Sequence, residues 1–154
     1  MTTDIPSLAA NLALGTLMGI LTVLIHFWGL LYLTHMMRRH RHRLRPMSDR
    51  THQSLVLLIV VFGIFVLHTL QIWSYAVVYV FLGEFGNFEA ALYFSTSAFT
   101  TVGFGDIVMS PRWRVLSAIE SANGWILFAW STAFLLTVTT RLKLLEHEWL
   151  EGDD

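Results

Sequence analysis

The sequence predicts an all-α integral membrane protein, and composition is the first evidence. Of its 154 residues, 55% are hydrophobic and only 14% are charged, which is far more apolar than a soluble domain of this length. Three apolar stretches, at about 8–34, 55–82 and 115–138, each exceed the ~20 residues that a helix needs to cross a bilayer. A shorter apolar run, 88–99, lies between the last two. We therefore expect three transmembrane helices and one re-entrant segment.

This composition also excludes several classes of function. Three crossings leave almost no room for a soluble catalytic domain, so we do not expect an enzyme. The chain has no cysteine, which excludes disulfides, thiolate metal ligands and cysteine nucleophiles. We expect neither an organic cofactor nor a nucleic-acid partner.

Residues 1–37 are predicted to form an N-terminal transmembrane helix. The leader 1–7 contains Asp4 and no basic residue, and the apolar run that follows is too long for the core of a signal peptide. We therefore expect this helix to be retained. Arginine does not recur at every third position in it, so it does not have the pattern of a voltage sensor.

Residues 38–50 form a basic linker that predicts the orientation of the chain. Cytoplasmic loops carry an excess of Lys and Arg, and Arg141 and Lys143 follow the last apolar stretch. With three crossings, a cytoplasmic linker and C-terminus place the N-terminus outside. Arg112 and Arg114 run against this rule. The linker could also bind anionic lipid. It holds six of the ten basic residues: Arg38, Arg39, Arg41, Arg43, Arg45 and Arg50.

Residues 51–141 are predicted to form a second domain that contains the re-entrant segment. Its first helix should begin near Arg50 and present aromatic residues of 73–81 to the outer membrane interface, among them Tyr75 and Tyr79. The run 88–99 would span only ~18 Å as a helix, about half a bilayer. Asn87 is a suitable N-cap for it. The tail 142–154 is expected to be a short cytoplasmic segment.

The segment 100–106, T-T-V-G-F-G-D, follows this half-length helix. Non-helical backbone at membrane depth is tolerated only where protein buries it or where it lines a water-filled path. Gly103 and Gly105 alternate with Val102 and Phe104, and glycine reaches positive φ without steric cost. Backbone of alternating handedness can turn successive carbonyls to one side, so the segment is suited to binding a cation.

This segment resembles the potassium-channel signature T-V-G-Y-G, and the chain resembles that family's bacterial two-helix pore domain with an extra N-terminal helix. The resemblance implies that potassium is the permeant ligand, bound by Thr101, Val102, Gly103 and Phe104, and that Gly105 completes the selectivity filter. A dehydrated ion needs oxygens on all sides, which four copies around an axis can supply. We therefore expect a tetrameric pore and a homotetramer.

Residues around the filter are expected to support it. Thr100 precedes it, and Asp106 resembles the family's acidic residue just outside it. Ser97 stands where some relatives have a glutamate that pairs with this aspartate, and Phe104 replaces the commoner tyrosine, so a hydroxyl behind the filter is missing. The retained aromatic favours potassium over sodium.

Two residues of the last helix have alternative interpretations. Glu120 is a carboxylate at membrane depth, which is costly to bury. Its carboxylate either forms a hydrogen bond to the back of the re-entrant helix, away from the ion path, or contacts the ion directly. Gly124 is either a gating hinge, because glycine weakens a helix interior, or a site of close helix packing.

His26 and His68 lie inside membrane helices. Each is either a neutral imidazole hydrogen-bonded between helices or a proton sensor. The first helix, which holds His26, is expected to pack outside the pore domain, against the outer helix or a neighbouring subunit.

Together these features predict a potassium-selective channel, with a weakly selective cation channel and a non-conducting scaffold or regulatory subunit as alternatives. A bacterial inner membrane is the expected location, with the lipid bilayer and other copies of the chain as partners.

Overall fold

Four helices make up the described part of the chain. The structure, a computed structural model, describes residues 8–40 and 49–141. The helices are α1 (Leu8–His40), α2 (Asp49–Phe81), α3 (Phe88–Phe99) and α4 (Arg114–Arg141). The all-α fold is therefore as predicted. The predicted leader, the tail 142–154 and linker residues 41–48 lie outside the described residues.

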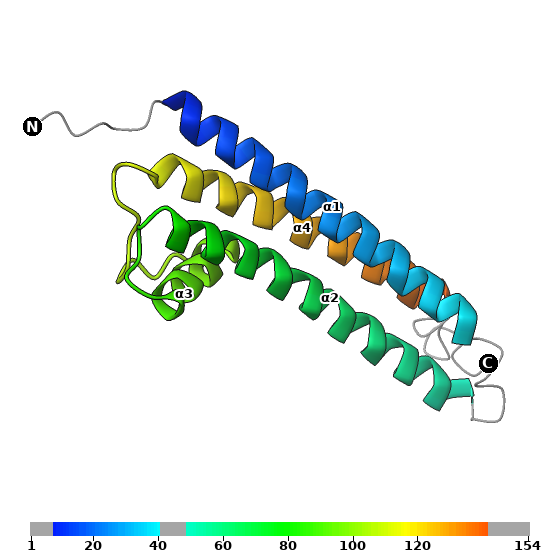
Figure 1. Ribbon diagram of the computed structural model, residues 1–154. Coiled ribbons are helices and arrows are strands. Elements are labelled where there is room, and N and C mark those ends of the chain that lie inside the picture. The colour runs from blue at the N-terminus through cyan, green and yellow to red at the C-terminus, as the bar shows by residue number, and fades with distance from the viewer. Residues whose placement is uncertain (1–7, 41–48, 142–154) are drawn as a thin grey trace, which may run out of the picture.

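Three of these helices are long enough to cross a membrane. At ~1.5 Å per residue, α4 with its 28 residues is ~42 Å long, and α1, α2 and α4 all have the length and hydropathy of membrane spans. They run side by side as a bundle, and α3 lies against α2 at one end (Figure 1). Large apolar side chains such as Phe62 and Phe65, which are 69% and 72% exposed, would face lipid.

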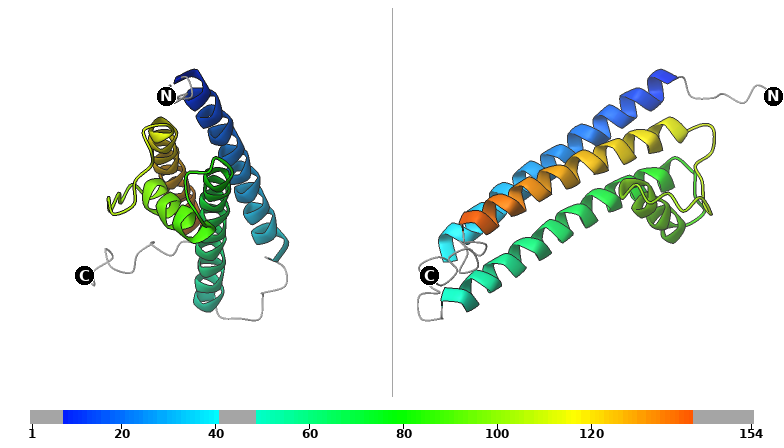
Figure 2. Two further views of the ribbon diagram at one scale, coloured as in Figure 1. Left: turned by 60° about the vertical axis from the view of Figure 1, so that its left-hand side comes forward. Right: turned by 180° about the vertical axis from the view of Figure 1, so that it is seen from behind.

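The N-terminal helix α1 contacts more of the bundle than the sequence predicted. Two views show α1 alongside α4 (Figure 2), and it contacts both α4 and α2. Buried polar side chains explain this placement. The Asn11 amide donates to the Arg112 carbonyl (3.1 Å) and accepts from the Leu116 amide (3.3 Å). Thr22 Oγ1 accepts from Asn123 Nδ2 of α4 (2.7 Å). α1 is thus part of the same helical bundle, not only a neighbour of the outer helix.

The prediction that Tyr75 and Tyr79 lie at the membrane interface is wrong. Both are fully buried, whereas Phe81 is 86% exposed. Their hydroxyls have partners inside the bundle: Tyr75 accepts from Asn123 Nδ2 (3.3 Å), and Tyr79 donates to Glu120. A tyrosine with a buried hydrogen-bond partner is stable in a core. The aromatic pattern in the sequence therefore did not distinguish tyrosines at the membrane interface from tyrosines buried between helices.

The main hydrophobic core lies where α2, α3 and α4 meet. Its buried members come from all four helices and from the segment before α4, so the core fixes α3 against the bundle. They are Met18, Ile72, Tyr75, Ala76, Tyr79, Ala91, Phe94, Phe99, Met109, Trp113, Leu116 and Leu127.

We predict that Thr22→Val lowers the stability of the bundle. Valine keeps the shape of threonine but removes the oxygen that accepts from Asn123. Hydrogen bonds between membrane helices contribute about 0.6–1.7 kcal/mol, so the free energy of unfolding should fall by that amount, measured by thermal unfolding in detergent. Thr16→Val, on an exposed part of the same helix, is the matched control. Equal stability of the two variants would contradict a structural role for this bond.

Candidate functional site

The half-length helix α3 has the bounds that the sequence predicted. Its N-cap is Asn87, whose side chain accepts from the Ala90 amide (2.8 Å), and Glu89 lies in the first turn. A negative charge there complements the helix dipole. Ser95 ties α3 to the bundle because its hydroxyl lies 2.9 Å from the Ile72 carbonyl of α2. α3 therefore holds a fixed position when the chain leaves it at Thr100.

The loop after α3 has a backbone of alternating handedness. Thr101, Gly103 and Gly105 have positive φ angles of 60°, 58° and 81°, and Val102 and Phe104 between them do not. The two glycines adopt the conformation that the sequence suggested. Thr101 was not foreseen, because positive φ is rare for a β-branched residue. The alternation of positive φ at Gly105 and Gly103, extended two residues back, would have predicted it. Such strain clusters at functional sites.

Ser97 of α3 holds the loop from behind. Its carbonyl accepts from the Gly103 amide (3.2 Å), and its hydroxyl oxygen accepts from the Phe104 amide (3.2 Å). Thr100 is held by its own helix, since its hydroxyl donates to the Thr96 carbonyl (2.7 Å). Two successive residues of α3, Thr96 and Ser97, thus fix the start and the middle of the loop.

Tyr93 supports the outer end of the loop and was not predicted. Its ring stacks on Phe104 with centroids 6.1 Å apart and an angle of 16°, and its hydroxyl donates to Asp106 Oδ2 (2.9 Å). This hydrogen bond raises the pKa of Tyr93 above its usual value. The hydroxyl that Phe104 lacks is therefore supplied by α3, one helical turn before Ser97.

The loop is open on one side in a single chain. Val102 is 56% exposed and Phe104 is 68% exposed, and the glycines are exposed as well. No group of three or more His, Cys, Asp or Glu side chains within residues 8–40 and 49–141 could hold a metal ion. A cation at this loop would be bound by backbone carbonyls and the Thr101 hydroxyl. In one chain the other side of such a cation would be open.

Glu120 lies behind α3, fully buried between three helices. One carboxylate oxygen accepts from the Ser95 hydroxyl of α3 (2.6 Å), and the other accepts from the Tyr79 hydroxyl of α2. Of the two interpretations offered by the sequence, this geometry matches a bond to the back of the re-entrant helix. Glu120 therefore joins α4 to α2 and α3.

Gly124 lies one turn further along α4, directly against the end of α3. A Cβ atom at this position would overlap the Phe99 carbonyl oxygen and lie 2.9 Å from the Phe99 carbonyl carbon. The missing side chain is what lets α4 approach the base of the loop. This is the geometry of close packing.

Comparison with known proteins agrees with this arrangement. A family model described as "Ion channel" matches residues 54–141, which is more than half of the chain and includes most of α2 and all of α3, the loop and α4. α1 lies outside the match. No curated protein and no solved structure gave a match.

We predict that Glu120→Leu destabilises the protein by about 1–3 kcal/mol, the cost of leaving a buried polar partner unpaired. The Tyr79 hydroxyl loses its acceptor, while Glu120→Gln retains an acceptor and should cost less. Thermal unfolding in detergent measures both variants. Glu89→Leu on the exposed face of α3 is the control, and an equally large loss there would show that charge removal, not burial, is responsible.

We predict that Gly124→Ala lowers the free energy of unfolding by about 1–3 kcal/mol, because the added methyl group overpacks the contact with Phe99. Gly19→Ala is the matched control, since a Cβ atom there meets nothing within 4 Å. It should leave stability unchanged or raise it slightly. An unchanged Gly124→Ala protein would mean that this contact does not set the approach of α4.

Proposed function

The chain belongs to the ion channel family whose two-helix pore domain is of the potassium-channel type, and on that premise we propose that it forms a homotetrameric, potassium-selective pore. As an ion channel with three membrane-spanning helices, it is a multi-pass membrane protein that carries out ion transport. The pore would pass potassium down its electrochemical gradient without covalent chemistry.

The alternation of φ along residues 101–105 carries this proposal. Positive φ at every second residue lets the carbonyls of Thr101, Val102, Gly103 and Phe104 turn toward one side. Rings of such carbonyls, one from each of four chains, replace the hydration shell of potassium. The Thr101 hydroxyl would complete the innermost site, and Gly105 gives the chain its outward turn.

The exposure of the loop supports assembly from several chains. Irregular backbone cannot face lipid, because its amides and carbonyls would have no partners. A single chain leaves Val102 and Phe104 more than half exposed, so neighbouring copies must cover this side. α3 adds a favourable field, since the C-terminal end of a helix carries a partial negative charge that attracts cations. In the tetramer, four such ends would surround the ion path.

Contacts behind the loop favour selectivity over weak discrimination. Ser97 binds the amides of Gly103 and Phe104, and Tyr93 stacks on Phe104 and binds Asp106. The loop is thus anchored at successive residues although Phe104 has no hydroxyl. A weakly selective cation channel remains the second candidate because of Phe104 itself.

The placement of basic residues supports one orientation. The C-terminal ends of α1 and α4 lie at the same end of the bundle, opposite α3 (Figure 1). Arg38, Arg39 and Arg141 are therefore at one end, which the excess of positive charge in cytoplasmic segments assigns to the cytoplasm. The loop would then face outside. We propose a bacterial inner membrane as the location, with anionic lipid at the basic end.

We predict potassium-selective flux from liposomes that contain the purified protein, and loss of most of this flux in Gly103→Ala. Gly103 has φ +58°, a conformation that costs an L-residue about 1–2 kcal/mol, and the strain would recur in every chain around the pore. Gly86→Ala is the matched control, because Gly86 has open space and no positive φ. It should conduct like the wild type.

Other outcomes would separate the alternatives. Equal potassium and sodium flux would contradict selectivity and leave the pore intact. An assembly verified as a tetramer that passes no ion under any gradient would contradict the channel proposal and favour a scaffold.

A further inference from the structure

Four buried polar side chains from three helices meet in the middle of the bundle. They are His26 of α1, His68 and Gln71 of α2, and Ser131 of α4, with exposed fractions of 0%, 7%, 0% and 5%. Buried polar groups are costly unless they are hydrogen-bonded. None of them touches the loop at 101–105, so the proposed pore does not account for them.

The four side chains form a closed ring of hydrogen bonds. His68 Nδ1 lies 2.9 Å from Gln71 Oε1, and Gln71 Nε2 lies 3.1 Å from His26 Nδ1. His26 Nε2 lies 3.4 Å from Ser131 Oγ, and Ser131 Oγ lies 3.0 Å from His68 Nε2. Each side chain therefore contacts two others, and the ring joins α1, α2 and α4.

A fifth contact determines which group donates and which accepts in each hydrogen bond of the ring. Gln71 Nε2 also lies 3.4 Å from the Thr22 carbonyl oxygen, which can only accept, so the amide nitrogen faces Thr22 and His26. Its oxygen then accepts from His68 Nδ1–H. The remaining assignments follow: Ser131 donates to His68 Nε2, His26 Nε2–H donates to Ser131, and Gln71 donates to His26 Nδ1. Every donor in the ring has one acceptor.

We propose that this ring is a pH-sensitive latch: it is closed when His26 and His68 are both neutral, and protons that enter it release α4 from α1 and α2. A proton on His26 Nδ1 would point at the Gln71 amide nitrogen, which is also a donor. A proton on His68 Nε2 would point at the Ser131 hydroxyl, which then has to donate elsewhere. The two imidazoles are only 5.5 Å apart, so two positive charges would repel each other.

A groove connects the ring with the base of the loop. It has a volume of about 340 Å³, lies between α2 and α4, is lined by His68 and Ser131 and extends to Thr96 and Thr100. The latch would respond to the pH of the water that enters this groove.

Other titratable groups lie toward the outer end of the bundle. α2 contributes Tyr75, whose hydroxyl is bonded to Asn123, and α4 contributes Glu120, which is bonded to Ser95 and Tyr79. α3 presents the uncharged ring of Phe99, 5.9 Å from His68. On α1, His26 itself is the titratable residue that faces the ring. The two histidines are therefore the titratable groups of the ring itself.

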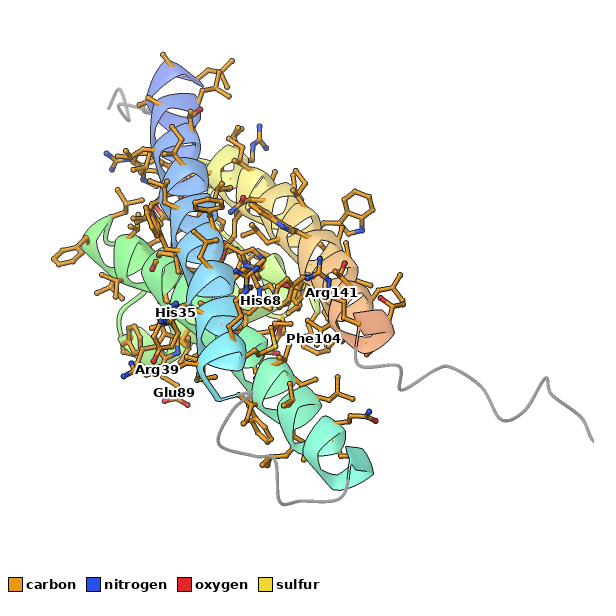
Figure 3. All side chains as sticks on the ribbon, turned by 90° about the vertical axis from the view of Figure 1, so that its right-hand side faces the viewer. His35, Arg39, His68, Glu89, Phe104 and Arg141 are labelled. Carbon is orange, nitrogen blue, oxygen red and sulfur yellow. The ribbon has the colours of Figure 1, made fainter. Side chains whose placement is uncertain are left out.

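Nuclear magnetic resonance of protein with ¹⁵N-labelled histidine in lipid bilayers tests the ring without any ion flux. We expect opposite tautomers at neutral pH: a proton on Nε2 of His26 and on Nδ1 of His68. Substituting each histidine with asparagine assigns the signals. His35, exposed on the C-terminal half of α1 (Figure 3), is the internal reference. The same tautomer at both sites, or titration curves that coincide with that of His35, would overturn the proposal.

The latch itself is tested by potassium flux, and this second measurement rests on the proposed channel function. When the pH is lowered from about 7.5 to about 4, so that imidazoles buried in the bundle take up protons, we expect wild-type flux to change about fivefold, as for an equilibrium that loses one hydrogen bond. Ser131→Ala removes one oxygen and opens the ring, so it should lose most of this response.

His35→Asn is the control and should respond to pH like the wild type. An identical pH response in Ser131→Ala and the wild type would contradict the latch. If the protein passes no ion at all, the proposed function fails, and the tautomers still decide whether the ring exists.

Discussion

The structure depends on one constraint: an irregular backbone at membrane depth must have partners for its amides and carbonyls. α3 meets part of this demand, because Ser97 binds the amides of Gly103 and Phe104. α4 reaches the base of the same loop because Gly124 has no side chain. The other side of the loop is exposed in a single chain, as Val102 and Phe104 show. The proposed assembly of several chains would satisfy the rest of this constraint.

The first helix shows how polar groups specify packing where the hydrophobic effect does not. Lipid is as apolar as leucine, so apolar faces give little preference for protein over lipid. α1 instead presents Asn11, Thr22 and His26 to α2 and α4, and each finds a partner there. Close contact helps, because Gly29 leaves room for Leu67. α1, which lies outside the region that the ion channel family model matches, is thus bound to that region at three positions along its length.

Much of the fold could be predicted from the sequence, because hydropathy and length determine which segments cross a membrane. The bounds of α3 and its Asn87 cap were read from one apolar run and one polar residue, and the glycines at 103 and 105 indicated positive φ. Rotation of the helices could not be predicted, since lipid-facing and protein-facing surfaces are both apolar. Tyr79 was therefore assigned to the interface although it is buried. The contact of Tyr93 with Asp106 depends on how the loop folds back, which no local pattern encodes.

Polar contacts hold α4 at two levels, and the difference between them bears on how it could move. Nearer the loop, Glu120 binds α2 and α3. Further along, Ser131 belongs to a ring that extra protons would open. Gly124 lies between these levels, in contact with Phe99. If the ring opens, the part of α4 beyond Gly124 loses its polar contacts with α1 and α2, while Glu120 still binds the part before it. Close packing and a hinge are then compatible, because the tight contact defines the point about which the helix would turn.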